Sequence, residues 1–363
     1  MRVLILSANT GGGHNSAAAA IREELTARGI ESETRDCLRY LSEKASEFIS
    51  WGHSYVYKNL PGLFGKVYEF EGNHQTTWIN DTIAMGVQRF YKTVKEEGFT
   101  HIVCVHVFAA MLVTEAKHRY GYAVPFYFVA TDYTCSPGVD TIEPAAWFTP
   151  DEALHEEFIA CGVPAERLVA TGIPIRRGFY QPPDQTAARR ALHLPLTGKL
   201  VLLCCGSIGC GHINRMAPEL EAVLPPDATL VIICGHNVRT YRKLRERVSW
   251  QTVVVGFTDR IAEYMAAADL CISKPGGLST TELMAVGLPM VLLLAVPGCE
   301  SRNLDYMLAR GFAIGAENWT AAIQATDRLL HQPEQLEEMR AQLRAHPQPV
   351  AAERLVDYIL QES

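Results

Sequence analysis

The chain has 363 residues, of which 48% are hydrophobic and 20% are charged, and its formal net charge is -7. These values are typical of a globular protein with two or three domains. The acidic balance argues against a general nucleic-acid-binding protein, which needs a basic surface. No apolar run approaches the ~18 residues that span a bilayer, and a predicted strand stands where a signal peptide would begin. The ten cysteines include no C-x-x-C pair and no zinc-type spacing, so we expect a cytoplasmic, reducing location.

Short apolar runs alternate with longer helical patterns along the chain. The runs are continuously apolar, which is typical of strands buried on both faces of a parallel sheet. We predict strands at 2–6, 101–107, 124–131, 145–149, 167–172, 200–206, 229–235, 252–257, 270–274 and 289–294. Helical patterns at 16–29, 238–248 and 281–287 lie among them. This alternation predicts an α/β fold with doubly wound sheets.

The alternation stops and restarts near the middle of the chain. Four prolines interrupt it, namely Pro174, Pro182, Pro183 and Pro195. We therefore place a linker from Ile173 to Gln185, between an N-terminal domain at 1–175 and a C-terminal domain at 176–348. Prolines at 347 and 349 divide the last helical stretch in two. We expect the final helix, at 349–363, to pack back on the N-terminal domain.

One region does not follow the alternation. Between Trp51 and Phe70 six aromatic residues are interleaved with Lys58 and Lys66. Helices with aromatic and basic residues can lie at a membrane interface, and two helices packed on a sheet have a similar composition. Both interpretations stay open, and the first predicts that membrane association runs through this segment.

A glycine-rich turn follows the first predicted strand, with Gly11, Gly12 and Gly13 before His14. Glycines let a ligand approach the backbone, and the helix that follows directs free N–H groups toward it. A tight structural turn is the alternative. The dinucleotide motif G-x-G-x-x-G lacks its third glycine here, and the P-loop motif is absent, which argues against a P-loop kinase and weakens the case for a dehydrogenase.

The second half contains features suited to a sugar nucleotide. A loop after the strand predicted at 270–274 opens a helix through Gly276, Gly277, Leu278, Ser279 and Thr280. Its backbone N–H groups could hold a pyrophosphate. Glu282, near the start of the helix, could accept hydrogen bonds from two ribose hydroxyls. A second loop, P-G-C-E-S-R-N, offers Glu300 and Asn303 to sugar hydroxyls.

With these motifs the chain resembles glycosyltransferase family 28. Its N-terminal half is most similar to the monogalactosyldiacylglycerol synthase and processive diacylglycerol glucosyltransferase group, through T-G-G-G-H, Y-V-Y-K-N-L-P-G-L-F-G-K-V-Y-E-F, V-H-V-F-A-A and F-V-A-T-D-Y. S-K-P-G-G-L-S-T-T-E, G-L-P-M and P-G-C-E-S-R-N resemble the family's donor motifs. The chain departs from the group after T-D-Y, where T-C-S-P-G-V-D replaces a His and a Trp, and at Cys299, which replaces a glutamine. These departures leave the acceptor and the donor sugar open.

The resemblance implies a GT-B architecture, in which two facing Rossmann-like domains hold the active site in their cleft. The N-terminal domain would bind the acceptor, and the C-terminal domain a UDP-sugar, with Gly256 and Phe257 near the uracil. It further implies an inverting transfer of a hexose to a membrane lipid such as diacylglycerol, by a protein peripheral to the inner face of the cell membrane.

Direct displacement needs a base for the acceptor hydroxyl and charge stabilisation for the leaving UDP. His14 is our first candidate for the base, because histidine titrates near neutral pH. His106 and Asp132, at the ends of predicted strands, are second-line candidates for supplying or orienting the base. The alternatives are a binding or structural histidine at 14 and loop hydrogen bonding at the other two positions.

No D-x-D pair occurs in the chain, so we expect no metal cofactor and assign the leaving-group charge to helix N-termini and loop amides. The basic stretch at 238–248 is interpreted as a solvated helix face. Three other functions remain as alternatives. They are the same donor chemistry on a polyprenyl-linked precursor or a soluble molecule, a UDP-sugar 2-epimerase, and a non-catalytic sugar-nucleotide sensor.

Overall fold

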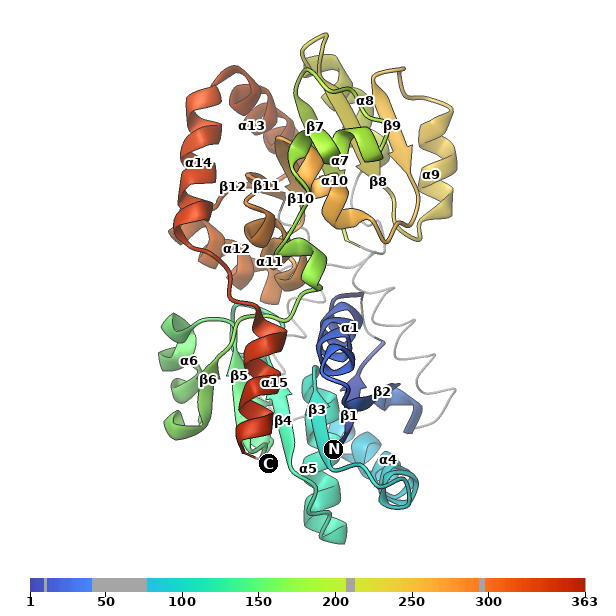
Figure 1. Ribbon diagram of the computed structural model, residues 1–363, viewed down its shortest axis with the longest axis vertical. Helices are drawn as coiled ribbons and strands as arrows, with labels where there is room; N and C mark the ends of the chain where they lie inside the picture. Colours follow the sequence, from blue (N-terminus) through green and yellow to red (C-terminus); the bar gives the residue numbers. More distant parts are fainter. Residues whose placement is uncertain (10–11, 41–76, 207–212, 294–297, 363) are drawn as a thin grey trace. The chain divides into compact units, whose positions relative to one another are not determined.

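The computed structural model describes residues 1–9, 12–40, 77–206, 213–293 and 298–362 (Figure 1). The chain divides into two units, one built mainly from Met1–Arg176 and Pro349–Ser363 and the other mainly from Arg177–Ala295 and Glu300–Gln348. Two sequence predictions lie outside the described residues. They concern Gly11 and the aromatic segment from Trp51 to Phe70.

The first unit contains a parallel sheet whose strands lie in the order β2-β1-β3-β4-β5-β6. The strands are β1 (Arg2–Ser7), β2 (Glu31–Asp36), β3 (His101–Cys104), β4 (Phe126–Val129), β5 (Ala146–Thr149) and β6 (Leu168–Ala170). The helices are α1 (Gly12–Ala27), α4 (Thr77–Lys95), α5 (Val107–Tyr120), α6 (His155–Ala160) and α15 (Ala351–Gln361). Successive residues of the central strands are buried, which requires helices on both faces of the sheet.

The second unit repeats this plan with the strand order β12-β11-β10-β7-β8-β9. The strands are β7 (Leu200–Cys204), β8 (Thr229–Ile233), β9 (Thr252–Val255), β10 (Leu270–Ser273), β11 (Met290–Leu293) and β12 (Ala313–Ala316). The helices are α7 (Gln185–Ala191), α8 (Ile213–Val223), α9 (Val238–Arg245), α10 (Ile261–Ala267), α11 (Gly277–Val286), α12 (Cys299–Ala309), α13 (Trp319–His331) and α14 (Pro333–Ala345). The predicted doubly wound α/β architecture is confirmed.

Two strands, β2 and β12, were not expected from the sequence. Both lie at the edge of a sheet. The residues of β2 are only half-buried or exposed, and those of β12 include the half-buried Ile314 and the exposed Gly315. An edge strand has one neighbour and partial cover, so it does not need the continuous apolar run by which the central strands were recognised.

Each sheet has one point at which the winding of the chain reverses. In the first unit β1 pairs with β2 on one side and with β3 on the other. In the second unit β7 pairs with β8 on one side and with β10 on the other. Open α/β sheets bind ligands outside the carboxyl ends of the strands at such reversal points. The ends of β1 and β3 and those of β7 and β10 are therefore the places to search for a site.

The C-terminal helix α15 belongs to the first unit. The Tyr358 ring meets the rings of Tyr127 and Phe148 edge-on, with centroids 6.3 and 5.4 Å apart. The chain returns to this unit beside Gly172, which has a φ of 91°. A Cβ at that glycine would lie 2.9 Å from Cγ of Pro349, so the close approach requires glycine.

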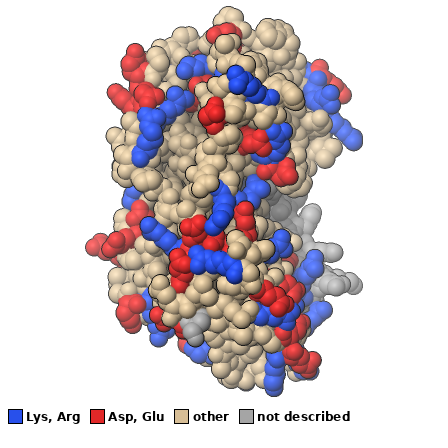
Figure 2. All heavy atoms as spheres, viewed as in Figure 1, with Lys and Arg blue, Asp and Glu red and all other residues tan. Residues whose placement is uncertain are grey.

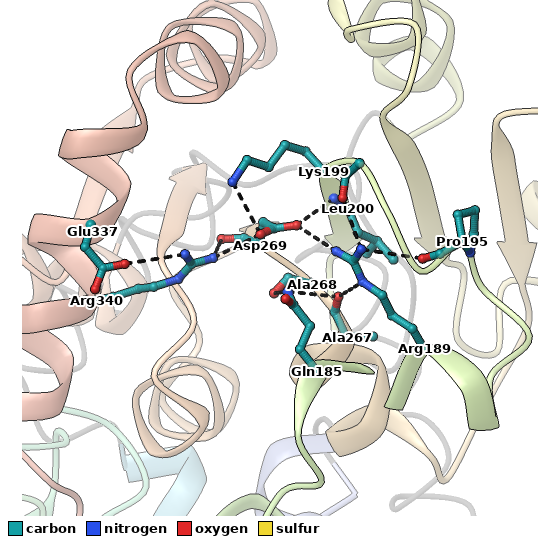
Figure 3. A network of polar contacts seen from close by, with 11 residues as sticks. Gln185, Arg189, Pro195, Lys199, Leu200, Ala267, Ala268, Asp269, Glu337 and Arg340 are labelled. Carbon is teal, nitrogen blue, oxygen red and sulfur yellow. Dashed lines mark hydrogen bonds and ion pairs between the residues drawn. The ribbon is translucent and has the colours of Figure 1, made fainter. Parts of the chain in front are cut away.

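A buried ion network holds the amino ends of β7 and β10 together (Figure 3). One oxygen of Asp269 accepts hydrogen bonds from the Arg189 guanidinium and from the Leu200 N–H, both at 2.8 Å. The other oxygen faces Arg340 at 3.3 Å and Lys199 at 3.6 Å. Because the carboxylate and the Arg189 side chain are both buried, removal of either charge would leave the other uncompensated.

We expect Asp269→Asn to lower the free energy of unfolding by about 3–5 kcal/mol, because Arg189 then stays buried without its counter-charge. Denaturant unfolding of the full chain measures this. Glu337→Gln is the matched control, since Glu337 is 58% exposed and pairs with Arg340 at the surface. It should cost less than about 1 kcal/mol. Equal effects of the two substitutions would show that the network does not stabilise the unit.

Candidate functional site

The turn between β1 and α1 is held by side-chain hydrogen bonds on both sides of the glycines. Ser7 Oγ donates to the Asn15 Oδ1 at 2.7 Å, and the Asn15 amide donates to Asn9 Oδ1 at 2.8 Å. Gly12 and Gly13 form the first turn of α1 and are half-buried. The predicted helix thus begins earlier than its alanine-rich stretch, and these two glycines are at once part of the turn and of the helix N-terminus.

His14 lies in the first turn of α1 with its ring against the end of β3. Its Nδ1 is 2.9 Å from the Val105 carbonyl oxygen and 3.1 Å from Thr131 Oγ1. A carbonyl oxygen only accepts, so Nδ1 carries the proton and Nε2 carries the lone pair of the neutral ring. Burial lowers the pKa of His14, and the Val105 carbonyl opposes this by stabilising the protonated form. The result is a neutral imidazole at pH 7 with Nε2 as the proton acceptor.

The structure brings His106 next to His14, with ring centroids 4.6 Å apart and planes at 70°. His106 is also the N-cap of α5, and its Nδ1 accepts the Phe108 N–H at 3.1 Å. That nitrogen therefore has a structural role. Asp132 is half-buried and directly follows Thr131 at the end of β4. His14 and His106 thus meet at the reversal point of the first sheet, and Asp132 is the neighbour in sequence of Thr131, which contacts His14. Sequence analysis did not identify the contacts from Val105 and Thr131.

The predicted glycine loop of the second unit forms the N-terminus of α11. Gly276 is its N-cap, and the Thr280 N–H makes the first intrahelical hydrogen bond, to the Gly276 carbonyl at 3.0 Å. The amides of Gly277, Leu278 and Ser279 precede that bond, so they are the donors that a helix N-terminus offers to an anion. The hydroxyl of Thr280 is fully buried and donates to the carbonyls of Gly276 and Gly277, both at 3.0 Å. It holds the loop from inside.

Lys274 lies at the reversal point of the second sheet, directly after β10. Its Nζ is 2.7 Å from the Glu300 carboxylate, which is buried at the start of α12. A Cβ added to Gly206 would lie 3.1 Å from Cε of Lys274, and a Cβ added to Gly276 would lie 3.7 Å from the same atom. The Lys274 side chain therefore crosses bare backbone at the ends of β7 and β10. Sequence analysis did not name this residue, although it is the last residue of the strand predicted at 270–274 and lies within S-K-P-G-G.

Residues from the predicted P-G-C-E-S-R-N loop, at the start of α12, contact the backbone and side chains just before α11. Asn303 is fully buried and donates from Nδ2 to the Pro275 carbonyl at 3.0 Å, and Glu300 fixes Lys274. These two residues were expected to bind sugar hydroxyls, which stays a prediction.

Glu282 was placed near the start of its helix. In the structure it is half-buried in the second turn of α11, because the helix begins at Gly277. Its ribose role also stays a prediction.

An exposed aromatic pair stands at the carboxyl ends of β8 and β9. Phe257 is 61% exposed, and its ring stacks on His236 with centroids 4.2 Å apart and planes at 18°. A Cβ on the preceding Gly256 would meet open space. The pair offers a flat surface suited to stacking, and the expected contact with uracil stays a prediction. His236 was not named from the sequence.

In the part of the chain that the structure describes, no three or more His, Cys, Asp or Glu side chains are grouped so as to hold a metal ion. The described helices include none with the length and apolarity needed to cross a membrane.

Comparison with known families assigns both units. Residues 14–175 match the family model for monogalactosyldiacylglycerol (MGDG) synthase, and residues 200–355 match the glycosyltransferase family 28 C-terminal domain. The chain belongs to glycosyltransferase family 28. The predicted family, the GT-B type fold and the prediction that the chain is a glycosyltransferase enzyme are confirmed.

Two relatives align with the whole of this chain. The processive diacylglycerol beta-glucosyltransferase of Bacillus cytotoxicus is 25% identical, over 100% of this chain and 94% of that protein. The protein of the same name from Bacillus cereus strain B4264 is 27% identical with the same coverage.

Solved structures resemble this family 28 chain in fold. MurG of Acinetobacter baumannii has a TM-score of 0.64 at 16% identity, covering 99% of both chains. The UDP-GlcNAc 2-epimerase from Neisseria meningitidis, bound to UDP-GlcNAc, has a TM-score of 0.65 at 13% identity, covering 99% of this chain and 100% of that one. The MurG structure and the epimerase structure have similar TM-scores, so the fold alone does not assign an activity.

Proposed function

We propose that this family 28 enzyme transfers a hexose from a UDP-sugar to a diacylglycerol-like lipid, with inversion at the anomeric carbon. The relatives named as diacylglycerol glucosyltransferases support the lipid acceptor. The observation that carries the mechanism is the neutral His14 ring, whose Nδ1 proton is held by the Val105 carbonyl at 2.9 Å. Such an enzyme takes a nucleotide sugar from the cytoplasm and a lipid from the membrane, so it works at the inner face of the cell membrane.

In the proposed reaction Nε2 of His14 removes the proton from the acceptor hydroxyl. The hydroxyl oxygen then forms a bond to the anomeric carbon while the bond from that carbon to UDP breaks, and UDP leaves with the electron pair. Gly12 and Gly13 at the start of α1 admit the reacting groups because they carry no side chains. His106 and Asp132 orient the base or the acceptor hydroxyl.

The second unit is proposed to hold the UDP portion. The amides at the start of α11 and the Lys274 ammonium stabilise the negative charge that grows on the leaving diphosphate. Glu300 and Asn303 keep this loop in place, and any contact with sugar hydroxyls adds to that role. The stacked Phe257 ring is assigned to the uracil.

Glu282 is proposed to bind the ribose hydroxyls from the second turn of α11. We expect Glu282→Ala to weaken UDP binding at least about tenfold, because each charge-assisted hydrogen bond contributes about 1.5–3 kcal/mol. Calorimetry with UDP measures this, and Glu263→Ala on α10 is the control, because that half-buried carboxylate is ion-paired with Arg260. Equal UDP affinity of wild type and Glu282→Ala would remove the ribose assignment.

Catalysis is proposed to need no divalent metal, since the chain has no D-x-D pair and Lys274 with the helix amides supplies the positive charge. Turnover should be unchanged by an excess of chelator. Loss of activity with chelator, and recovery with magnesium or manganese, would contradict this and give the diphosphate charge to a metal.

Three alternatives make different predictions for UDP release. A transferase releases UDP only when a lipid acceptor is present, and a panel of UDP-sugars with and without diacylglycerol tests this. Release with a polyprenyl phosphate or a soluble alcohol instead would keep the donor chemistry and change the acceptor. Acceptor-independent conversion of the nucleotide sugar indicates an epimerase, and binding without turnover indicates a sensor.

A further inference from the structure

The surface of α9 carries a basic and apolar face that the proposed site does not use. Residues 238–250 contain five Arg or Lys and one acidic residue, Glu246. Thr240 and Leu244 are buried against the second unit, so the helix has a fixed inner face. Arg239, Arg242 and Lys243 stand on the opposite, exposed face, where positions three and four apart lie next to one another.

Apolar side chains flank this basic face at both ends. Val238 at the start of α9 is 55% exposed, and Trp250 in the turn before β9 is 88% exposed. An indole with that exposure finds no packing partner in its own domain, and its placement beside cations is typical of interfacial segments. The described residues place no carboxylate at ion-pair distance from Arg239, Arg242 or Lys243, whereas exposed Arg119 and Arg344 on other helices are paired.

Figure 2 shows Lys and Arg spheres, with some Asp and Glu spheres beside them, at the edge of the second unit where Figure 1 places α9. The whole chain has a net charge of -7, so the cations of α9 are a local feature. A local cationic helix with a protruding Trp fits a surface that is both negatively charged and apolar below its charge layer.

We propose that the face formed by Val238, Arg239, Arg242, Lys243 and Trp250 docks the second unit on an anionic lipid bilayer. The cations attract acidic headgroups, and Trp250 and Val238 enter the headgroup region. The choice of a membrane over a nucleic acid rests on the proposed function, in which the acceptor is a membrane lipid.

Vesicle binding of the purified full-length protein, without donor or acceptor, tests this surface. Vesicles of phosphatidylcholine and phosphatidylglycerol in equal parts are compared with phosphatidylcholine alone. We expect co-sedimentation with the anionic vesicles and its loss at high salt, which screens exposed charges. Glutamine at Arg239, Arg242 and Lys243 together, which preserves helix propensity, should weaken binding roughly hundredfold. Trp250→Ser should weaken it roughly tenfold.

The matched control is glutamine at Arg190, Arg328 and Arg344 together, which removes the same charge from exposed positions on α7, α13 and α14. Its vesicle binding should stay within about threefold of wild type, because those charges do not reach the bilayer. Calorimetry with UDP should give wild-type affinity for all variants, which shows that the second unit is folded. Wild-type vesicle binding by the α9 triple variant, or an equal loss in the control, would overturn the proposal.

The α9 face would behave differently in these binding assays if its partner were not a membrane. Binding of an RNA or DNA oligonucleotide that Trp250→Ser leaves unchanged, with no vesicle binding, would make α9 a nucleic-acid contact and overturn the proposal. Vesicle binding that depends on α9, in a protein that forms no glycolipid, would keep the docking surface and remove the proposed function.

Discussion

Replacing His14 with alanine is expected to lower kcat by about 10²–10⁴ and to leave the affinity for UDP nearly unchanged. The reason is that the ring takes the acceptor proton in the first unit, whereas UDP is assigned to the second. Thr131→Val is the graded comparison, because it removes only the hydroxyl that lies 3.1 Å from Nδ1. With the Val105 carbonyl still in place, it should lower kcat much less than His14→Ala does.

The pH dependence of kcat follows from the lowered pKa of His14. A base must be deprotonated to act, so the rate falls as the pH drops through its pKa. Because burial places that pKa below the ordinary histidine value of 6.5, the acid limb should lie below pH 6.5. His14→Ala should lack this limb. A variant that keeps wild-type kcat, or that loses UDP binding in proportion to activity, would transfer the base role to Asp132 or His106.

Removing the Lys274 ammonium is expected to weaken UDP binding by about 10–100-fold, because a charge-assisted contact with the diphosphate is lost. The single variant Lys274→Met would remove the ion-pair partner that the buried Glu300 carboxylate has in Lys274, which costs about 3–5 kcal/mol of stability. The double variant Lys274→Met/Glu300→Gln removes both charges and keeps the two shapes. It therefore separates donor binding from folding.

Lys199→Met is the control for this double variant. Lys199 is a partly exposed lysine of the same unit, 3.6 Å from Asp269 at the opposite end of the sheet. Calorimetry should show wild-type UDP affinity for Lys199→Met and the full loss for the double variant. If the double variant folds and binds UDP like wild type, Lys274 only holds Glu300, and the helix amides bind the diphosphate alone.

The central strands could be predicted from the sequence because burial on both faces leaves a direct mark. Val3 to Leu6 of β1 and Leu200 to Leu203 of β7 are almost completely buried, and each reads as an unbroken apolar run. The edge strand β2, with the sequence E-S-E-T-R-D, has no apolar run, and β12 has only the short run A-I-G-A, in which Gly315 is exposed.

The sequence predicted which residues lie at the candidate site of the first unit, but it did not predict their hydrogen-bond partners. His14 and Asp132 follow predicted strands and His106 lies at the end of one, and parallel strands bring their ends to one edge. The carbonyl that sets the tautomer of His14 belongs to Val105, whose place depends on the pairing of β3 with β1. Backbone groups carry no residue signature, so this contact could not be inferred.

Polar residues inside glycine motifs were the least certain part of the sequence analysis. Thr280 and Asn303 have the chemistry of ligand-binding side chains, yet both are fully buried and hydrogen-bonded to the backbone of the loop. Sequence alone does not distinguish a residue that contacts a ligand from one that shapes the loop around it. Lys274 shows the reverse, because a lysine at a strand end was passed over until its approach to Gly206 was seen.

The most direct test of the account is the anomeric configuration of the lipid product. Wild-type protein is incubated with diacylglycerol and the UDP-sugar that supports UDP release, and the lipid fraction is examined by mass spectrometry and proton NMR. The account predicts a hexosyl-diacylglycerol whose new linkage is β when the donor is α-linked, formed by wild type and nearly absent with His14→Ala. An α-linked product, or an epimerised nucleotide sugar with no glycolipid, would contradict it.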